Sequence, residues 1–117
     1  DGTGVRDYIH VEDLADAHLR AVDYLRGGGA STTLNCGYGH GYSVREVLRM
    51  VEQVHGKPLQ VTEEPRREGD PPTLVARADR IRQLLGWRPH HDDLETIVAT
   101  QLAWERTLQA RPELCRN

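Results

Sequence analysis

The sequence predicts a small mixed α/β fold in one domain, with about four helices and three or four short strands. Three observations lead to this prediction. One early segment alternates between apolar and polar residues, which is typical of a half-buried strand. Several later segments carry apolar residues at helical spacing, behind residues that cap helices. Glycine or proline stands at the end of most of these segments and separates the elements.

The first element is a predicted strand over residues 5–11. It would carry Val5, Asp7, Ile9 and Val11 on one face, and Arg6, Tyr8 and His10 on the other. Asp7 would then lie among apolar neighbours, so we expect its carboxylate to be strongly hydrogen-bonded or paired. Arg6 and Tyr8 should project together onto a polar surface.

Two amphipathic helices are predicted in the first half of the chain. Residues 12–26 begin with two acidic residues, carry an apolar stripe and end at Gly27. Ser43 and Glu46 have the spacing of a capping box, which predicts a second helix from this point to Gly56.

Two more helices are predicted in the second half. One covers residues 79–85, with Ile81, Leu84 and Leu85 facing inward, and Trp87 should fill the core just beyond its end. The last covers residues 93–109, with Asp92 and Glu95 as its caps and an apolar side that includes Trp104. Short extended segments are predicted at residues 32–36, 59–62 and 74–76.

Composition excludes several classes of protein. The chain is 38% apolar but only 5% aromatic and lacks phenylalanine, so its core should be thin. A net charge of -3 provides no field that would gather nucleic acid or an anionic membrane. No apolar run approaches the roughly 18 residues of a membrane-spanning helix. The two cysteines, Cys36 and Cys115, lack the spacing of a disulfide framework or zinc site, which fits a reducing, cytoplasmic location.

A glycine-rich loop at residues 37–42 imitates a dinucleotide-binding turn. The fingerprint Gly-x-Gly-x-x-Gly needs its last glycine at the position of Tyr42, where close packing of helix and strand would require it. We therefore interpret the loop as a plain strand-to-helix connection and predict no cofactor-binding residue in this chain.

Other catalytic signatures are weak. The six histidines are scattered, and the adjacent pair His90 and His91 is unsuited to converge on one metal, so no metal ligand is predicted. The sequence has no Gly-x-Ser-x-Gly elbow, and no tyrosine is followed four residues later by lysine. We predict no catalytic residue here.

The loop Arg66-Arg67-Glu68-Gly69-Asp70-Pro71-Pro72 is more informative. An arginine pair in a loop is usually a solvated cluster. Here, however, guanidinium groups match phosphate oxygens in a bidentate way, and prolines reduce the entropy lost when a ligand orders the loop. Arg6 with one arginine of the pair would balance a diphosphate, and Asp70 would accept from ribose hydroxyls. The residue types favour a nucleoside diphosphate site.

The sequence resembles the UDP-glucose 4-epimerases, members of the extended short-chain dehydrogenase/reductase family. The resemblance covers residues 1–110. It rests on residues 1–11, on Asp13-Leu14-Ala15-Asp16-Ala17-His18, on Gly41-Tyr42-Ser43-Val44 with Glu46-Val47, on Pro65 to Pro72, and on Leu85-Gly86-Trp87. It implies that Arg6 and Arg67 contact the UDP diphosphate, that Asp70 contacts ribose, and that Tyr8 lies near the same site.

The resemblance also implies a domain organisation. Residues 1–117 would form the C-terminal UDP-sugar-binding portion of such a protein, without its Rossmann half, and residues 12–36 would pack on the NAD-binding domain. The start at Asp1, without methionine, fits a chain that begins inside a longer protein. The longer protein would be a homodimer, and this portion alone could self-associate through exposed apolar faces.

The implied activity is inversion at C4 of UDP-glucose and UDP-galactose by hydride transfer to and from NAD. NAD and the catalytic Tyr-x-x-x-Lys pair would belong to the preceding half, so this portion alone would be inactive. Two alternatives stay open. One is a non-catalytic nucleotide-sugar-binding module, and the other is a related nucleotide-sugar dehydratase or decarboxylase.

Overall fold

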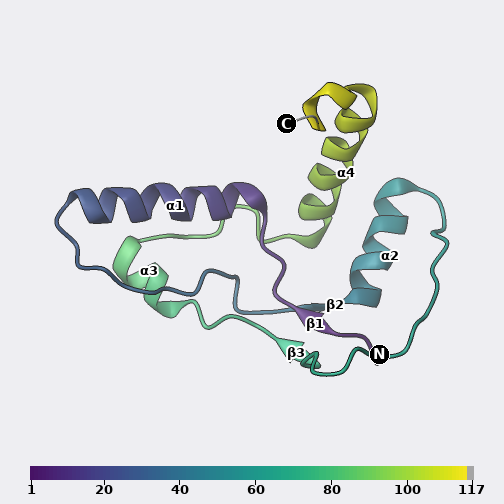
Figure 1. Ribbon diagram of the computed structural model, residues 1–117, viewed down its shortest axis with the longest axis horizontal. Helices are drawn as coiled ribbons and strands as arrows, with labels where there is room; N and C mark the ends of the chain where they lie inside the picture. Colours follow the sequence, from purple (N-terminus) through teal and green to yellow (C-terminus); the bar gives the residue numbers. More distant parts are fainter. Residues whose placement is uncertain (116–117) are drawn as a thin grey trace.

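The computed structural model describes residues 1–115 and contains a three-stranded sheet in the order β2-β1-β3 (Figure 1). The central strand β1 (Val5–Arg6) pairs antiparallel with β2 (Tyr42–Ser43) and parallel with β3 (Thr73–Leu74). The small mixed α/β fold is confirmed.

The predicted strand over residues 5–11 is shorter than expected, because only its first two residues join the sheet. From Asp7 onward, hydrogen bonds to the Asp7 side chain take the place of backbone hydrogen bonds between strands. The Asp7 carboxylate accepts hydrogen bonds from the backbone N–H groups of Tyr38, Gly39 and Ala76 at 3.0, 3.0 and 3.2 Å. The expectation that Asp7 is strongly hydrogen-bonded is therefore confirmed, and the same bonds explain why regular strand pairing stops there.

Two predicted strands are wrong, since residues 32–36 and 59–62 have no strand pairing. The third predicted extended piece, 74–76, overlaps β3 by one residue only. Short apolar runs indicate burial, but a strand also needs an adjacent edge to pair with, and sequence periodicity does not reveal that edge.

The predicted helices are confirmed within a residue or so at each end. They are α1 (Val11–Arg26), α2 (Val44–His55), α3 (Asp79–Leu85) and α4 (Leu94–Ala110), followed by the 3-10 turn η1 (Pro112–Cys115). The capping box of Ser43 and Glu46 is present at the start of α2, and Gly56 ends that helix in the left-handed conformation at φ 81°. At α4, the N-cap is Asp93 rather than Asp92, because the Asp93 side chain accepts from the Thr96 N–H.

The core gathers where α1, α3 and the loop after residue 36 meet. Trp87 is fully buried, as predicted, among Ala17, Tyr38, Ala78 and Ile81. Leu84 and Trp104, which the helical stripes placed inward, are instead 42% and 49% exposed. A second contact joins α2 to α4, which lie beside each other (Figure 1).

The molecule is extended rather than spherical, with α1 and α2 at opposite ends of its long axis (Figure 1). Its radius of gyration is 17.1 Å, whereas a compact domain of this length has about 13 Å. Its accessible surface is 8850 Å², against about 6,400 Å² for a folded monomer of this mass. Much apolar surface therefore lacks a partner within the chain. Among residues 1–115, no helix combines the length and apolar character needed to cross a bilayer.

Candidate functional site

The β1–β3 pairing builds the candidate site. The charged loop at residues 63–72 leads directly into β3, and β3 lies parallel to β1 with Val5 opposite Thr73. The Val5 N–H also donates to the Pro72 carbonyl at 2.9 Å. This register places the end of the loop beside Arg6, although 64 residues separate Arg6 from Asp70 along the chain.

Arg6 is held in place by two contacts. One terminal nitrogen of its guanidinium donates to the Val5 carbonyl at 2.8 Å, and the other forms an ion pair with Asp70 at 2.5 Å. Both partners keep part of their side chains exposed, 28% for Arg6 and 48% for Asp70. A guanidinium has five N–H donors, so these two bonds leave capacity for a ligand.

An open cavity of about 570 Å³ lies between the start of the chain and the charged loop. Its charged lining residues are Arg6, Glu64, Arg66, Arg67 and Asp70. This size falls within the range of small-molecule sites, about 300–1,000 Å³. Three arginines face two carboxylates, so an anion entering the cavity meets a net positive charge, and Asp70 is the acceptor closest to Arg6.

Three of the four predicted site residues come together here. Arg6, Arg67 and Asp70 all line the cavity, whereas Tyr8 is half-buried and does not line it. Arg66, which the sequence could not distinguish from Arg67, donates to the Gly2 carbonyl at 3.2 Å and so ties the loop to the start of the chain. The two arginines therefore have different surroundings within the same loop.

The glycine-rich loop is packed against its own chain. A Cβ built on Gly37 would lie 2.6 Å from both the Ala76 Cβ and an Asp7 oxygen. A Cβ on Gly41 would lie 2.7 Å from Val5 and 2.9 Å from Val75. These glycines permit close approach between segments of this chain, and the space beside them is already filled. Packing within the chain therefore accounts for both glycines.

A buried carboxylate that sequence reasoning missed joins α1 to the loop after residue 36 and to residues 90–91. Asp13 is 2% exposed and accepts from the Tyr38 hydroxyl at 2.5 Å and from the backbone N–H groups of His90 and His91 at 3.0 Å each. Burial raises the pKa of Asp13, but these hydrogen bonds outweigh burial, so its pKa is lowered overall. Burial, followed by the bond to Asp13, raises the pKa of Tyr38.

The position of Asp13 on α1 gave one possible signal for this role. An acidic residue in a first helical turn is usually an exposed partner of the helix dipole. Asp13 differs from such a residue only because it lies on the buried face of α1, as does Ala17 one turn later. The backbone of Asp13 is also bonded to the core, because the Trp87 indole N–H donates to the Asp13 carbonyl at 2.9 Å.

Comparison with known proteins gives a consistent result. Residues 1–37 match the model of the NAD dependent epimerase/dehydratase family. A UDP-glucose 4-epimerase from Azospirillum brasilense is 60% identical over 109 residues, which are 93% of this chain and 31% of that protein. This chain matches the C-terminal portion of UDP-glucose 4-epimerases. It spans about a third of the length of the curated relatives it matches.

Solved epimerase structures have the same fold over this portion. The UDP-glucose 4-epimerase of Stenotrophomonas maltophila, with bound NAD and formylated UDP-arabinopyranose, is 41% identical and superposes with a TM-score of 0.87 over 94% of this chain and 32% of that one. The enzyme from Bifidobacterium longum, in complex with NAD+ and UDP, is 38% identical with a TM-score of 0.80 over 92% of this chain and 31% of that one.

Proposed function

We propose that this chain forms the UDP-binding portion of an NAD-dependent epimerase that interconverts UDP-glucose and UDP-galactose. The observation that carries the proposal is the cavity where Arg6, Arg67 and Asp70 meet, in a chain similar to UDP-glucose 4-epimerases. In this proposal, the two guanidinium groups hold the diphosphate and Asp70 accepts from the ribose hydroxyls. Tyr8, two residues from Arg6, borders the same ligand from outside the cavity.

To bind the nucleotide, Arg6 and Asp70 must contact the ligand while they stay paired with each other. Each side chain keeps exposed surface, so the diphosphate and the ribose can add to the pair without burying either charge. The rigid prolines after Asp70 lower the entropy lost when the loop closes on the ligand. A firm hold on the nucleotide end lets the sugar end turn while the intermediate stays bound.

We also propose that residues 12–36 pack on an NAD-binding domain, where NAD would be held. In α1, the exposed apolar residues are Val11, Leu14, Leu19, Val22 and Leu25. A groove of about 250 Å³ with a mainly apolar lining runs between α1, residues 32–36 and α3. Leu14 and Leu25 line this groove, and an exposed apolar groove of this kind typically belongs to an interface. The whole protein would be a homodimer, and this chain alone would self-associate through the same surface.

A chimera tests the proposed activity directly. Residues 1–117 would replace the matching portion of the Azospirillum brasilense epimerase, and the product would be assayed for conversion of UDP-galactose to UDP-glucose. We expect a chimera that retains NAD, as judged by absorbance, to interconvert the two sugars. A folded, NAD-loaded chimera that binds UDP-sugars without converting them would instead favour the binding-module alternative.

Within that chimera, Arg67→Ala should weaken UDP binding by about 2 kcal/mol, or about 30-fold, because a charge-assisted hydrogen bond is lost. The matched control is Arg66→Ala, whose side chain contacts the Gly2 carbonyl. It should change UDP affinity much less. Calorimetric titration with UDP measures both variants, and equal affinities for Arg67→Ala and the parent would refute the diphosphate role.

The proposed domain contact has its own test. Hydrogen exchange of the α1 backbone N–H groups should be slower in the chimera than in the isolated chain, since the apolar face of α1 becomes covered. The amides of α2, which packs on α4 within this chain, serve as the internal reference. Equal protection of α1 in both proteins would contradict the proposed contact.

A further inference from the structure

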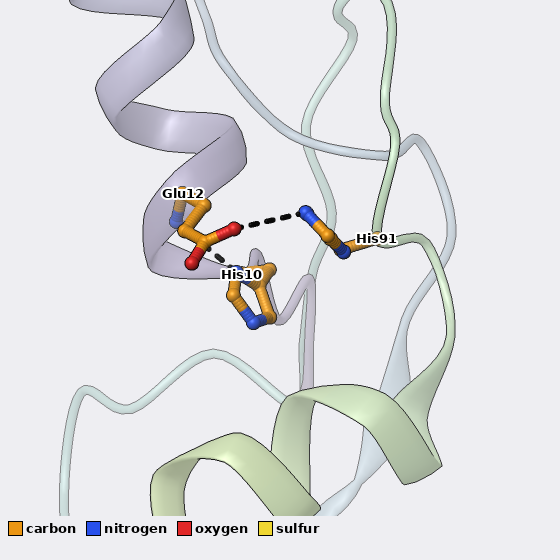
Figure 2. A group of neighbouring side chains, drawn as sticks. All are labelled: His10, Glu12 and His91. Carbon is orange, nitrogen blue, oxygen red and sulfur yellow. Dashed lines mark hydrogen bonds and ion pairs between the residues drawn. The ribbon is translucent and has the colours of Figure 1, made fainter. Parts of the chain in front are cut away.

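Two histidines that are 81 positions apart in the sequence meet at the start of α1. The rings of His10 and His91 have centroids 4.5 Å apart, and Glu12 adds a carboxylate to the same place. One potential ligand atom from each of the three residues lies within 4.8 Å of the others (Figure 2). The histidines are scattered along the sequence, with no predicted metal role, but the fold brings these two together.

The protonation state of His10 follows from its partners. Its Nδ1 accepts from the Glu12 backbone N–H at 3.1 Å, and a backbone N–H can only donate. Nδ1 is therefore unprotonated and His10 is neutral. Its Nε2 then carries the proton and donates to the Thr100 hydroxyl at 2.9 Å, while that hydroxyl donates to a carbonyl one turn back in α4. The Nδ1 lone pair of His10 thus caps the start of α1, and its other nitrogen is held by a second residue, as is the outer nitrogen of most histidine metal ligands.

The three side chains differ in how freely they can move. His10 is 4% exposed, and a metal ion reaches its Nδ1 only when the ring tilts away from the Glu12 backbone nitrogen, which lies 3.1 Å from Nδ1. The side chain of Glu12 is 71% exposed and that of His91 is 34% exposed, and these two already lie 3.1 Å apart (Figure 2). Ligand atoms of a tetrahedral zinc ion are about 3.4 Å apart, given bonds of about 2.0–2.1 Å. Binding would therefore need rotation of the Glu12 and His91 side chains together with the tilt of the His10 ring.

We propose that His10, Glu12 and His91 bind one divalent transition-metal ion, of which zinc is the best fit. Two imidazoles and one carboxylate are ligands that zinc accepts, and such a set leaves a fourth position for water or another ligand. His10 and Glu12 also line an open hollow between the start of α1 and α4, so the fourth position faces solvent. The metal takes the Nδ1 lone pair, and the Glu12 N–H in the exposed first turn passes to water. The buried Asp13 carboxylate accepts from the His91 backbone N–H. Its negative charge adds a potential that favours a cation at this site.

Calorimetric titration of the chain with zinc chloride tests this site, in a Cys115→Ser background because Cys115 is an exposed thiol. We expect one zinc ion per chain. His91→Gln should weaken binding by at least on the order of 100-fold, and Glu12→Gln should also weaken it, since each removes a ligand. The matched control, His90→Gln, changes the neighbouring histidine and should leave the affinity unchanged.

A second measurement distinguishes the histidines as ligands. With Co²⁺ in place of zinc, the parent should develop the visible absorption of a tetrahedral site, and His91→Gln should lose it. Thr100→Val removes the partner of the His10 ring and should weaken zinc binding about 10-fold, with circular dichroism unchanged. An absence of zinc binding, or equal losses in His91→Gln and His90→Gln, would overturn the proposal.

Discussion

Replacing Trp87 with alanine should lower the free energy of unfolding by about 4 kcal/mol, the largest effect we expect for a single substitution. The side chain is fully buried and lies parallel to the Tyr38 ring, with centroids 6.5 Å apart. Alanine would leave a cavity in a thin core and remove the indole bond to the Asp13 carbonyl. Since small domains are stable by only about 5–15 kcal/mol, this loss would remove at least about a quarter of the free energy of unfolding.

Urea titration followed by circular dichroism measures this effect, and the second tryptophan provides the control. Trp104 is 49% exposed, so Trp104→Ala should cost less than about 1 kcal/mol. If both variants had the same unfolding midpoint, Trp87 would not be the centre of the core.

Asp13→Asn should destabilise the chain by about 3 kcal/mol, because hydrogen bonds to a charged group are worth about 1.5–3 kcal/mol each. Asparagine is close in shape, but its NH2 group would face donors. The Asp13 carboxylate accepts from three of them, Tyr38 and the N–H groups of His90 and His91. The control is Asp16→Asn on the same helix, which removes only an exposed ion pair with Arg20 and should cost about 0–1 kcal/mol.

The same carboxylate predicts a dependence on pH. The pKa of Asp13 is lower in the folded chain than its ordinary value of 3.8. Its contribution is therefore fully present above the unfolded pKa, near 3.9, and is lost as the pH falls through the folded pKa. The stability gap between the parent and Asp13→Asn should be constant from pH 7 to about pH 5 and narrow below about pH 4. A gap that stays constant down to pH 2 would contradict the assigned role.

Local signals in the sequence predicted the helices well. The capping box of Ser43 and Glu46, and the helix ends at Gly56 and Gly86, depend on residues within one turn of each other. The hydrogen-bonded state of Asp7 was also predictable, since a carboxylate between apolar neighbours must find donors. Which donors it finds was not predictable, because they come from residues 38, 39 and 76.

Strand partners and the candidate sites depend on the tertiary structure. The short apolar runs at residues 32–36 and 59–62 resemble strands locally, but the chain brings no edge beside them. The residue types of the arginine loop predict an anion site, while the β1–β3 register brings Arg6 beside Asp70.

The sequence by itself determined the helices, the capping box of α2 and the buried Trp87, while nucleotide binding at the charged loop stays a prediction. Only the tertiary structure decided the three-stranded pairing, the burial of Asp13 and the meeting of His10 with His91. The physical reason is the range of the interactions. Helix propensity and capping act between residues at most about four positions apart, whereas sheet pairing and side-chain clusters depend on contacts between segments far apart in the chain.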